Sequence, residues 1–124
     1  MRASPELSGR LHALYAAMTD GDAERVESLY SLAPGSLFIG TSGEEFWTDS
    51  ARHNADVRPY WTPGNLTVTA GHVHAISIGD VGFTVDRPTM RLRDGTTFDL
   101  RLTLIWRREA DGWRVIHSHA SVAS

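Results

Sequence analysis

The 124-residue sequence contains no cysteine and no lysine, and its formal net charge at pH 7 is only −3. Without cysteine, neither disulfides nor thiolate zinc sites can form. Because all 12 basic residues are arginine, no lysine can form a Schiff base with a carbonyl substrate. The arginines are spread along the chain without a basic run, so we expect no nucleic acid partner. The first residues lack the apolar run of a signal peptide, which predicts a cytoplasmic protein with no membrane partner.

Two amphipathic helices are predicted at the start of the chain. Residues 4–6, Ser-Pro-Glu, combine a capping hydroxyl, a proline at the first helical position and an acid near the positive end of the helix dipole. The apolar face of this first helix carries Leu7, Leu11, Leu14, Tyr15 and Met18. We expect the helix to end at Gly21, and Asp22 to cap a second helix that ends at the Pro34-Gly35 turn.

The rest of the chain changes to a period of two. A short strand is predicted at 36–41, followed by a third helix that begins at Thr48 or Asp49 and ends at Arg58. Four longer alternating runs then cover 66–78, 81–92, 96–108 and 113–122. Because the turns between them are short, they predict an antiparallel meander. Residues 1–124 therefore predict one α+β domain, with the helices on one face of a curved sheet.

The alternation also predicts which side chains face inward. One face of the third run carries Phe98, Leu100, Leu102, Leu104 and Trp106. If Gly95 is left-handed in a three-residue turn, Met90 lies beside Phe98 on this face, and Asp86 also points inward.

The same pairing by twos, applied to the last hairpin, predicts which side chains of the stretch "DGWRVIHSHASV" at 111–122 face inward. Pairing Trp106 with Val115 places Leu104 opposite His117 and Leu102 opposite His119. The histidines, and Ser121 in phase with them, are therefore predicted on the inner face. A row of Asp86, Leu102 and His119 follows, in which an acid and an imidazole share one cavity.

Taken together, the quoted segments resemble a known superfamily. "MTDGD", "LFIGT", "GEEFW", "VGFTVDRPTMRLRDG", "RLTLIWRRE" and "DGWRVIHSHASV" look like the SnoaL-like branch of the nuclear transport factor 2-like superfamily, over essentially the whole chain. The resemblance implies a cone-shaped sheet, mixed or antiparallel, wrapped around the N-terminal helices, as in ketosteroid isomerase and cystatin-like folds. It also implies a deep pocket and a homodimer. The catalytic aspartate of ketosteroid isomerases falls near Gly40 and Thr41 here, so that mechanism does not transfer.

Polyketide cyclases of the SnoaL type use an aspartate with a histidine or another polar partner, and Asp86 with His119 or His117 is the equivalent that the resemblance implies. An imidazole suits acid and base work because it titrates near neutral pH. Structural readings stay open: each histidine can bond a backbone carbonyl, and Asp86 can pair with Arg87 or cap the bend before Pro88. Tyr15 is a further candidate, as a hydrogen-bond donor to a ligand oxygen.

The expected pocket lining is aromatic and apolar, as a planar ligand requires, although the same side chains also suit a core. It comprises Trp47, Tyr60, Trp61, Met90, Leu102, Leu104, Trp106 and Ser121. His72 and His74 form a second H-x-H pair, but two strands should separate it from the first, so no metal site is predicted. No cofactor is expected either.

Two functions follow as hypotheses. The first is a cofactor-independent isomerase, cyclase or dehydratase acting on a hydrophobic, polyketide- or steroid-like molecule. The second is a ligand-binding or assembly module with the same pocket and no chemistry. In both cases, apolar residues on the outer face of the last two strands predict a homodimer interface. That interface comprises Arg101, Thr103, Ile105, Ile116 and Val122.

Overall fold

The computed structural model describes residues 1–123, so Ser124, the last residue of the predicted domain, lies outside the described part. The helices are α1 (Pro5–Asp20), α2 (Ala23–Ser28), α3 (Ser50–Val57) and the short 3₁₀ helix η1 (Arg58–Tyr60). The early strands are β1 (Arg2–Ala3), β2 (Leu37–Ile39) and β3 (Phe46–Trp47). The later strands are β4 (Leu66–Thr69), β5 (His74–Ile78), β6 (Val81–Asp86), β7 (Thr89–Leu92), β8 (Thr97–Glu109) and β9 (Gly112–Val122).

The predicted helix starts and the end of α1 are confirmed by their caps, whereas α2 ends at Ser28, before the predicted end at the Pro34-Gly35 turn. The Ser4 hydroxyl accepts a hydrogen bond from the Leu7 amide at 3.1 Å, and Gly21 ends α1 in the left-handed region at φ 67°. Asp22 and Asp49 cap α2 and α3 in the same way, by accepting from the amides of Arg25 and Arg52.

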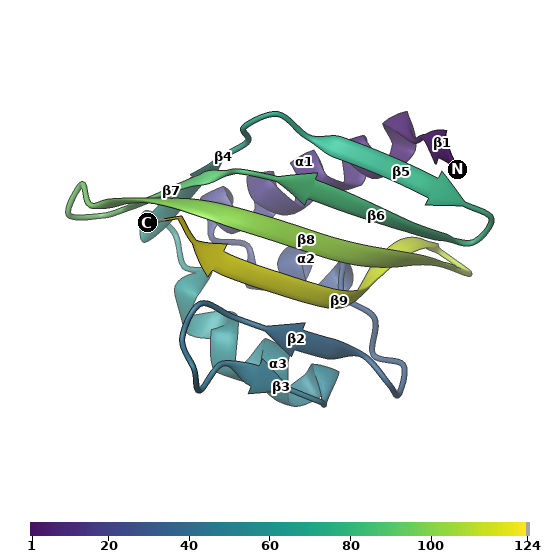
Figure 1. Cartoon of the computed structure of the whole chain (residues 1–124). Helices are drawn as coiled ribbons and strands as arrows, with labels where there is room; N and C mark the ends of the chain where they lie inside the picture. The colour runs from purple at the N-terminus through teal and green to yellow at the C-terminus, as the bar shows by residue number, and fades with distance from the viewer. Residues whose placement is uncertain (124) are drawn as a thin grey trace.

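The sheet is curved and mixed, and it has the order β1-β5-β6-β8-β9-β2-β3. Two of the four predicted runs are each broken into a pair of strands, at residues 70–73 and at Arg87-Pro88. At the second break, the proline cannot donate to the ladder. The outlying halves, β4 and β7, pair with each other away from the main path, while β2 runs parallel to β9. Figure 1 shows the helices on the far side of the sheet, which confirms the α+β class and the one-sided layering.

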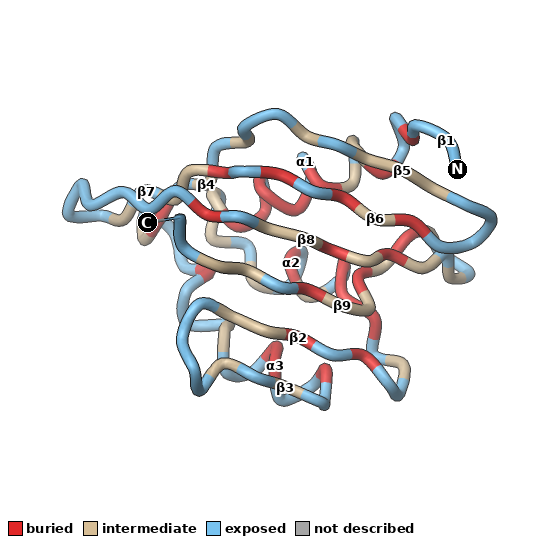
Figure 2. Tube along the Cα trace, viewed as in Figure 1, coloured by how far each residue is buried: buried red, intermediate tan, exposed pale blue. Residues whose placement is uncertain are grey.

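The core lies between α1 and the inner face of the sheet. Its fully buried side chains include Leu7, Leu11, Leu14, Phe38, Leu104, Trp106, Trp113 and Val115. Figure 2 shows this burial as red segments on α1, α2 and the middle of the long strands, whereas the hairpin ends are exposed. No described helix is both long and apolar enough to cross a membrane.

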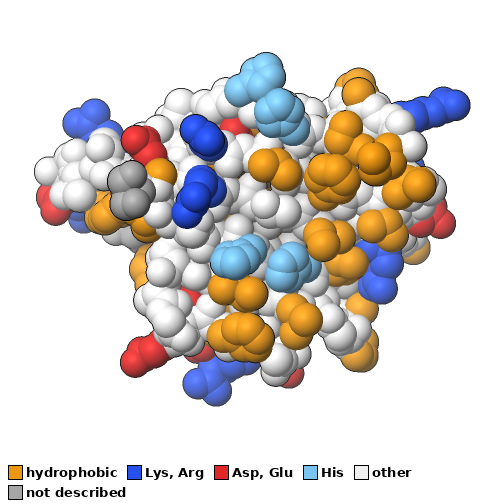
Figure 3. Space-filling view, in the orientation of Figure 1, with side chains coloured by type: hydrophobic (Ala, Val, Ile, Leu, Met, Phe, Trp, Pro, Cys, Tyr) orange, Lys and Arg blue, Asp and Glu red, His pale blue; other side chains and the backbone are white. Residues whose placement is uncertain are grey.

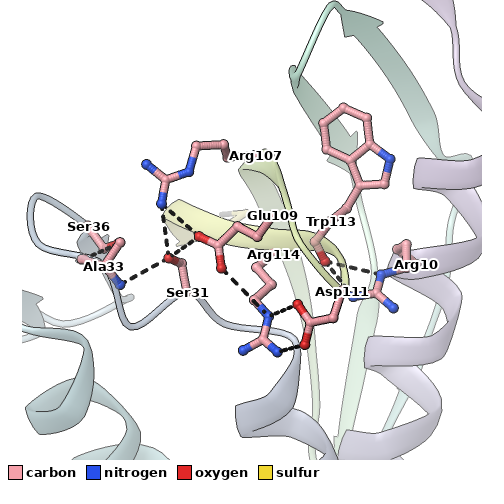
Figure 4. A network of polar contacts seen from close by, with 9 residues as sticks. All are labelled: Arg10, Ser31, Ala33, Ser36, Arg107, Glu109, Asp111, Trp113 and Arg114. Carbon is pink, nitrogen blue, oxygen red and sulfur yellow. Dashed lines mark hydrogen bonds and ion pairs between the residues drawn. The ribbon is translucent and has the colours of Figure 1, made fainter.

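A polar network holds the loop after α2 to the β8–β9 hairpin (Figure 4). The Glu109 carboxylate accepts hydrogen bonds from the Ser31 hydroxyl at 2.6 Å and from the Arg107 guanidinium at 2.7 Å. The hydrogen bond from Ser31 has the largest effect in lowering the pKa of Glu109, and the bond from Arg107 lowers it further. Arg114 extends the network to Asp111, and Arg10 of α1 donates to the Trp113 carbonyl. The hairpin is therefore bonded both to the loop after α2 and to α1.

The register of the final strand differs from the prediction. Arg108 pairs with Trp113 and Trp106 with Val115 as expected, but Ile105 then pairs with His117. Ile116 is thus an extra residue in β9, a β-bulge, and every side chain after it changes face. From Ser118 to Val122 the strand presents to the inside the residues that alternation had placed outside.

Candidate functional site

A cavity of about 350 Å³ lies between the inner face of the sheet, α1, α3 and η1. Its walls are largely apolar and aromatic. The residues of the predicted site that line it are Tyr15, Trp47, Tyr60, Trp61, Met90 and Leu102. Side chains from the end of β9 complete the wall, namely Ser118, Ala120 and Val122. An apolar enclosure with a small number of polar groups is the usual form of a small-molecule site.

Tyr15 and Asp86 form a buried pair at one wall of the cavity. The Tyr15 hydroxyl donates to Asp86 Oδ2 at 2.9 Å, although the two residues are 71 positions apart in the chain. Asp86 is only 2% exposed, and it faces inward beside Leu102, as the predicted register requires. Burial raises the pKa of Tyr15, and the hydrogen bond to Asp86 raises it further, so the phenol is neutral at pH 7.

Asp86 is held from behind by the segment before β5. The Gly71 amide donates to Asp86 Oδ2 at 3.2 Å, whereas Oδ1 is buried and has no hydrogen-bond partner among residues 1–123. Any side chain at Gly71 would collide with the Arg87 carbonyl, which lies 2.5 Å from the position of a Cβ atom. Glycine is therefore required where this segment approaches the carboxylate, and the carboxylate in turn orients Tyr15.

His53 on α3 also lines the cavity, and it was missing from the predicted site. Its ring stacks on Phe38 with centroids 4.3 Å apart, and the edge of Trp47 meets it at 5.0 Å. Because the ring is buried, the pKa of His53 is lowered, although a hydrogen bond with Asn54 partly opposes the shift. The cap at Asp49 offered a signal in the sequence, since it places Ser50, His53 and Asn54 on one helical face.

Two further residues that carry hydroxyl groups, Tyr30 and Ser118, line the cavity. Tyr30 lines the cavity with its ring centroid 5.1 Å from that of His53, and its proximity contributes to the raised pKa of Tyr15. Burial raises the pKa of Tyr30 as well. Ser118 lies on the inner face of β9 and also lines the cavity. Thr41, Glu45 and Asn65 also line the cavity, and the rest of the wall is largely apolar.

The bulge corrects the predicted place of the histidine pair. His117 and His119 lie on the outer face of β9, where His117 Nδ1 is 2.9 Å from the Leu37 carbonyl oxygen of β2. Ser121 also faces outward and accepts a hydrogen bond from Arg101. The predicted row is therefore wrong at one end: the neighbour of Leu102 is Ala120 rather than His119.

Three further placements differ from the prediction. Leu104 and Trp106 belong to the closed core rather than to the cavity wall, and the Trp106 indole donates to the Thr84 hydroxyl at 3.0 Å. Val122, predicted on the outer face, lines the cavity instead, because it also follows the bulge.

The second H-x-H pair lies at the start of β5, which β6 and β8 separate from β9 in the sheet. The rings of His72 and His74 are 4.9 Å apart, edge to face. Within residues 1–123, no three His, Asp or Glu side chains are grouped as a metal ion would require.

Comparisons with solved structures show the same fold in several bacterial proteins. A nuclear transport factor 2-like protein of unknown function from Pseudomonas putida KT2440 has a TM-score of 0.83 and 17% identity, covering 97% of this chain and 89% of that one. A candidate dehydratase of the same family from Streptomyces avermitilis has a TM-score of 0.81 and 19% identity, with 95% and 94% covered. A nuclear transport factor 2-like protein of unknown function in nutrient uptake from Rhodospirillum rubrum has a TM-score of 0.74 and 28% identity, with 95% and 98% covered.

Sequence comparison gives the family. No curated protein sequence matches the chain significantly. The SnoaL-like domain, however, matches residues 9–124, which is nearly the whole length and contains every side chain of the cavity described above. The chain therefore belongs to the SnoaL-like domain family.

Proposed function

We propose that this protein binds a small, largely apolar molecule in the cavity and moves a proton on it through Tyr15 and Asp86. One observation carries the proposal: a buried carboxylate holds a cavity-lining phenol by a 2.9 Å hydrogen bond. A buried acid has little value for stability, since burying a charge is costly unless it is fully paired, and Asp86 Oδ1 has no partner among residues 1–123. Such pairs are concentrated at functional sites.

The pair can act as a relay. Tyr15 lines the cavity whereas Asp86 stands behind it, so a ligand would contact the phenol. A proton leaving an acidic C–H or O–H group of the ligand would pass to the Tyr15 oxygen as the phenol proton passes to Asp86. The ligand is left as an enolate or alkoxide, and Asp86 becomes a neutral acid. Reversal of both transfers returns the proton to the same atom or to another.

Return to a different carbon gives an isomerisation. In a dehydration, a neighbouring hydroxyl group would take the proton back from Asp86 through Tyr15 and leave as water, which restores the carboxylate. The second outcome is in keeping with the candidate dehydratase from Streptomyces avermitilis, whose fold this chain shares. General acid and base catalysis of this kind contributes factors of about 10² to 10⁴ in rate.

Hydrogen exchange at carbon tests the relay without knowledge of the natural substrate. We would incubate the protein in D₂O with 2-tetralone, a bicyclic ketone with acidic C–H groups, and follow deuterium uptake by NMR. We expect the wild-type protein to accelerate uptake, and Tyr15→Phe and Asp86→Asn to reduce the acceleration by about 100-fold or more. His119→Gln, which alters an exposed side chain, serves as the matched control. Binding of 2-tetralone without any accelerated uptake would instead favour a ligand-binding module without chemistry.

A second proposal concerns the outer face of the sheet, which we infer joins two copies of the chain. Figure 3 looks onto this face and shows hydrophobic side chains gathered over the strands, with histidines beside them. Thr103, Ile105 and Ile116 are only half-buried here, whereas Ile78 and Val81 are exposed. Monomeric proteins seldom expose large apolar patches, and a two-fold pair would cover the patch on both copies. Light scattering at micromolar concentration should give the mass of a dimer, and Ile105→Asp should give that of a monomer.

A further inference from the structure

The side chain of His53 has one nitrogen engaged and one available. His53 Nδ1 lies 3.1 Å from the Asn54 side-chain oxygen. An amide oxygen can only accept, so Nδ1 carries the proton and donates it. In a neutral imidazole the other nitrogen, Nε2, then presents a lone pair, and burial lowers the pKa of the ring, which keeps it neutral.

Aromatic neighbours hold the His53 ring in place. Phe38 stacks on the face of the ring, and Trp47 closes its edge. Trp47 is itself held, because its indole donates to Asp56 at 2.9 Å. His53 is 6% exposed, and it is one of the residues that line the cavity. Among residues 1–123, no donor forms a hydrogen bond with Nε2.

The cavity volume limits the size of a ligand. A cavity of about 350 Å³ is at the lower end of the range for sites of drug-sized ligands, so it accommodates a ligand of one or two fused rings. The aromatic wall formed by Trp47, Trp61 and Tyr30 suits a planar ring system.

We propose that His53 determines specificity: its Nε2 accepts a hydrogen bond from a hydroxyl group of the ligand, so the cavity selects planar one- or two-ring compounds that carry a phenolic or enolic hydroxyl. The inference rests on the proposed function, since it assigns the ligand class of the same cavity. It also adds to it, because an enol is the neutral form of the enolate that proton removal by Tyr15 and Asp86 would generate. A buried acceptor disfavours ligands that leave it unpaired, which makes this kind of discrimination strong.

Paired probes test the assignment. 2-Naphthol carries a hydroxyl group on a bicyclic ring, and 2-methoxynaphthalene is the same ring with that donor removed. Both fluoresce, so binding to the whole protein can be measured from the anisotropy of the ligand. We expect wild-type protein to bind 2-naphthol about tenfold more tightly, equivalent to about 1.4 kcal/mol. His53→Phe keeps a flat ring against Phe38 and should reduce the preference to about onefold, whereas His119→Gln should retain it.

A second measurement needs no variant. In ¹⁵N-labelled protein, the histidine NMR spectrum should show His53 with an unprotonated Nε2, and this resonance should shift on addition of 2-naphthol but not of 2-methoxynaphthalene. A proton on Nε2 in the free protein would overturn the assignment. Equal binding of the two probes to wild type, or a preference that survives in His53→Phe, would overturn it as well while leaving the proposed ligand cavity intact. Failure of both probes and of 2-tetralone to bind would overturn the proposed function itself.

Discussion

The bond between Tyr15 and Asp86 predicts a specific cost for removing one hydroxyl group. Tyr15→Phe keeps the ring and removes the donor, so the buried carboxylate would retain only the Gly71 amide at 3.2 Å. A hydrogen bond to a charged group is worth about 1.5–3 kcal/mol of stability. With an unfolding entropy of about 2.1 cal/mol/K per residue over 124 residues, the melting temperature should fall by about 6–12 °C.

A double-variant cycle separates this bond from general packing effects. Asp86→Leu removes the charge that Tyr15 satisfies, so the double variant Tyr15→Phe with Asp86→Leu should lose less stability than the two single costs together, by about 1 kcal/mol or more. Tyr30→Phe is the matched control, because Tyr30 lines the same cavity and the phenol that bonds to Asp86 is that of Tyr15. Urea unfolding at fixed protein concentration gives the free energies. A cost for Tyr15→Phe no larger than for Tyr30→Phe, together with simple additivity in the cycle, would refute the reasoning.

Three further outcomes follow from the same structure. Because burial raises the pKa of Tyr30, the folded protein keeps a proton that the unfolded chain loses above about pH 10. This group should therefore lower the free energy of unfolding there by about 1.4 kcal/mol per pH unit. In urea unfolding at several pH values, Tyr30→Phe should show a smaller fall of the midpoint than wild type. Gly71→Ala should cost about 1–3 kcal/mol in urea unfolding, since its Cβ would press on the Arg87 carbonyl, and it should shift the NMR signals of Tyr15; an unchanged midpoint would contradict the close approach. The lowered pKa of Glu109 implies stability that is present above its ordinary pKa and lost as pH falls through the folded one, so acid unfolding of Glu109→Gln should depend less steeply on pH than that of wild type.

Regular patterns in the sequence predicted the parts of the fold that local physics determines. The caps at Ser4 and Gly21 fixed α1, and the turn at Gly95 fixed the pairing of Met90 with Phe98, which placed Asp86 inward. Tyr15 belonged to the apolar stripe of α1, but its contact with Asp86 spans 71 positions and depends on how the helix lies across the sheet. No local pattern carries that information.

Two features were missed for identifiable physical reasons. The buried face of α3 is polar, with Ser50, His53 and Asn54, so hydrophobic periodicity gave no indication that His53 points inward. The bulge at Ile116 contains no glycine or proline, and the adjacent apolar residues Val115 and Ile116 suit either face of the strand, so the sequence pattern did not show the insertion. One undetected residue was enough to exchange Ser118 for His117 in the wall.

The bulge also means that the last strand encodes two alternative cavity linings. With Ile116 in the bulge, the strand gives the cavity a hydroxyl, a methyl and an isopropyl group from Ser118, Ala120 and Val122. A regular register that paired Ile116 with Ile105 would instead turn His117 and His119 inward. The chemistry of the wall therefore depends on strand register at a single position as much as on residue identity. The register that is observed keeps both imidazoles out of the cavity, in a strand that is not itself at the edge of the sheet.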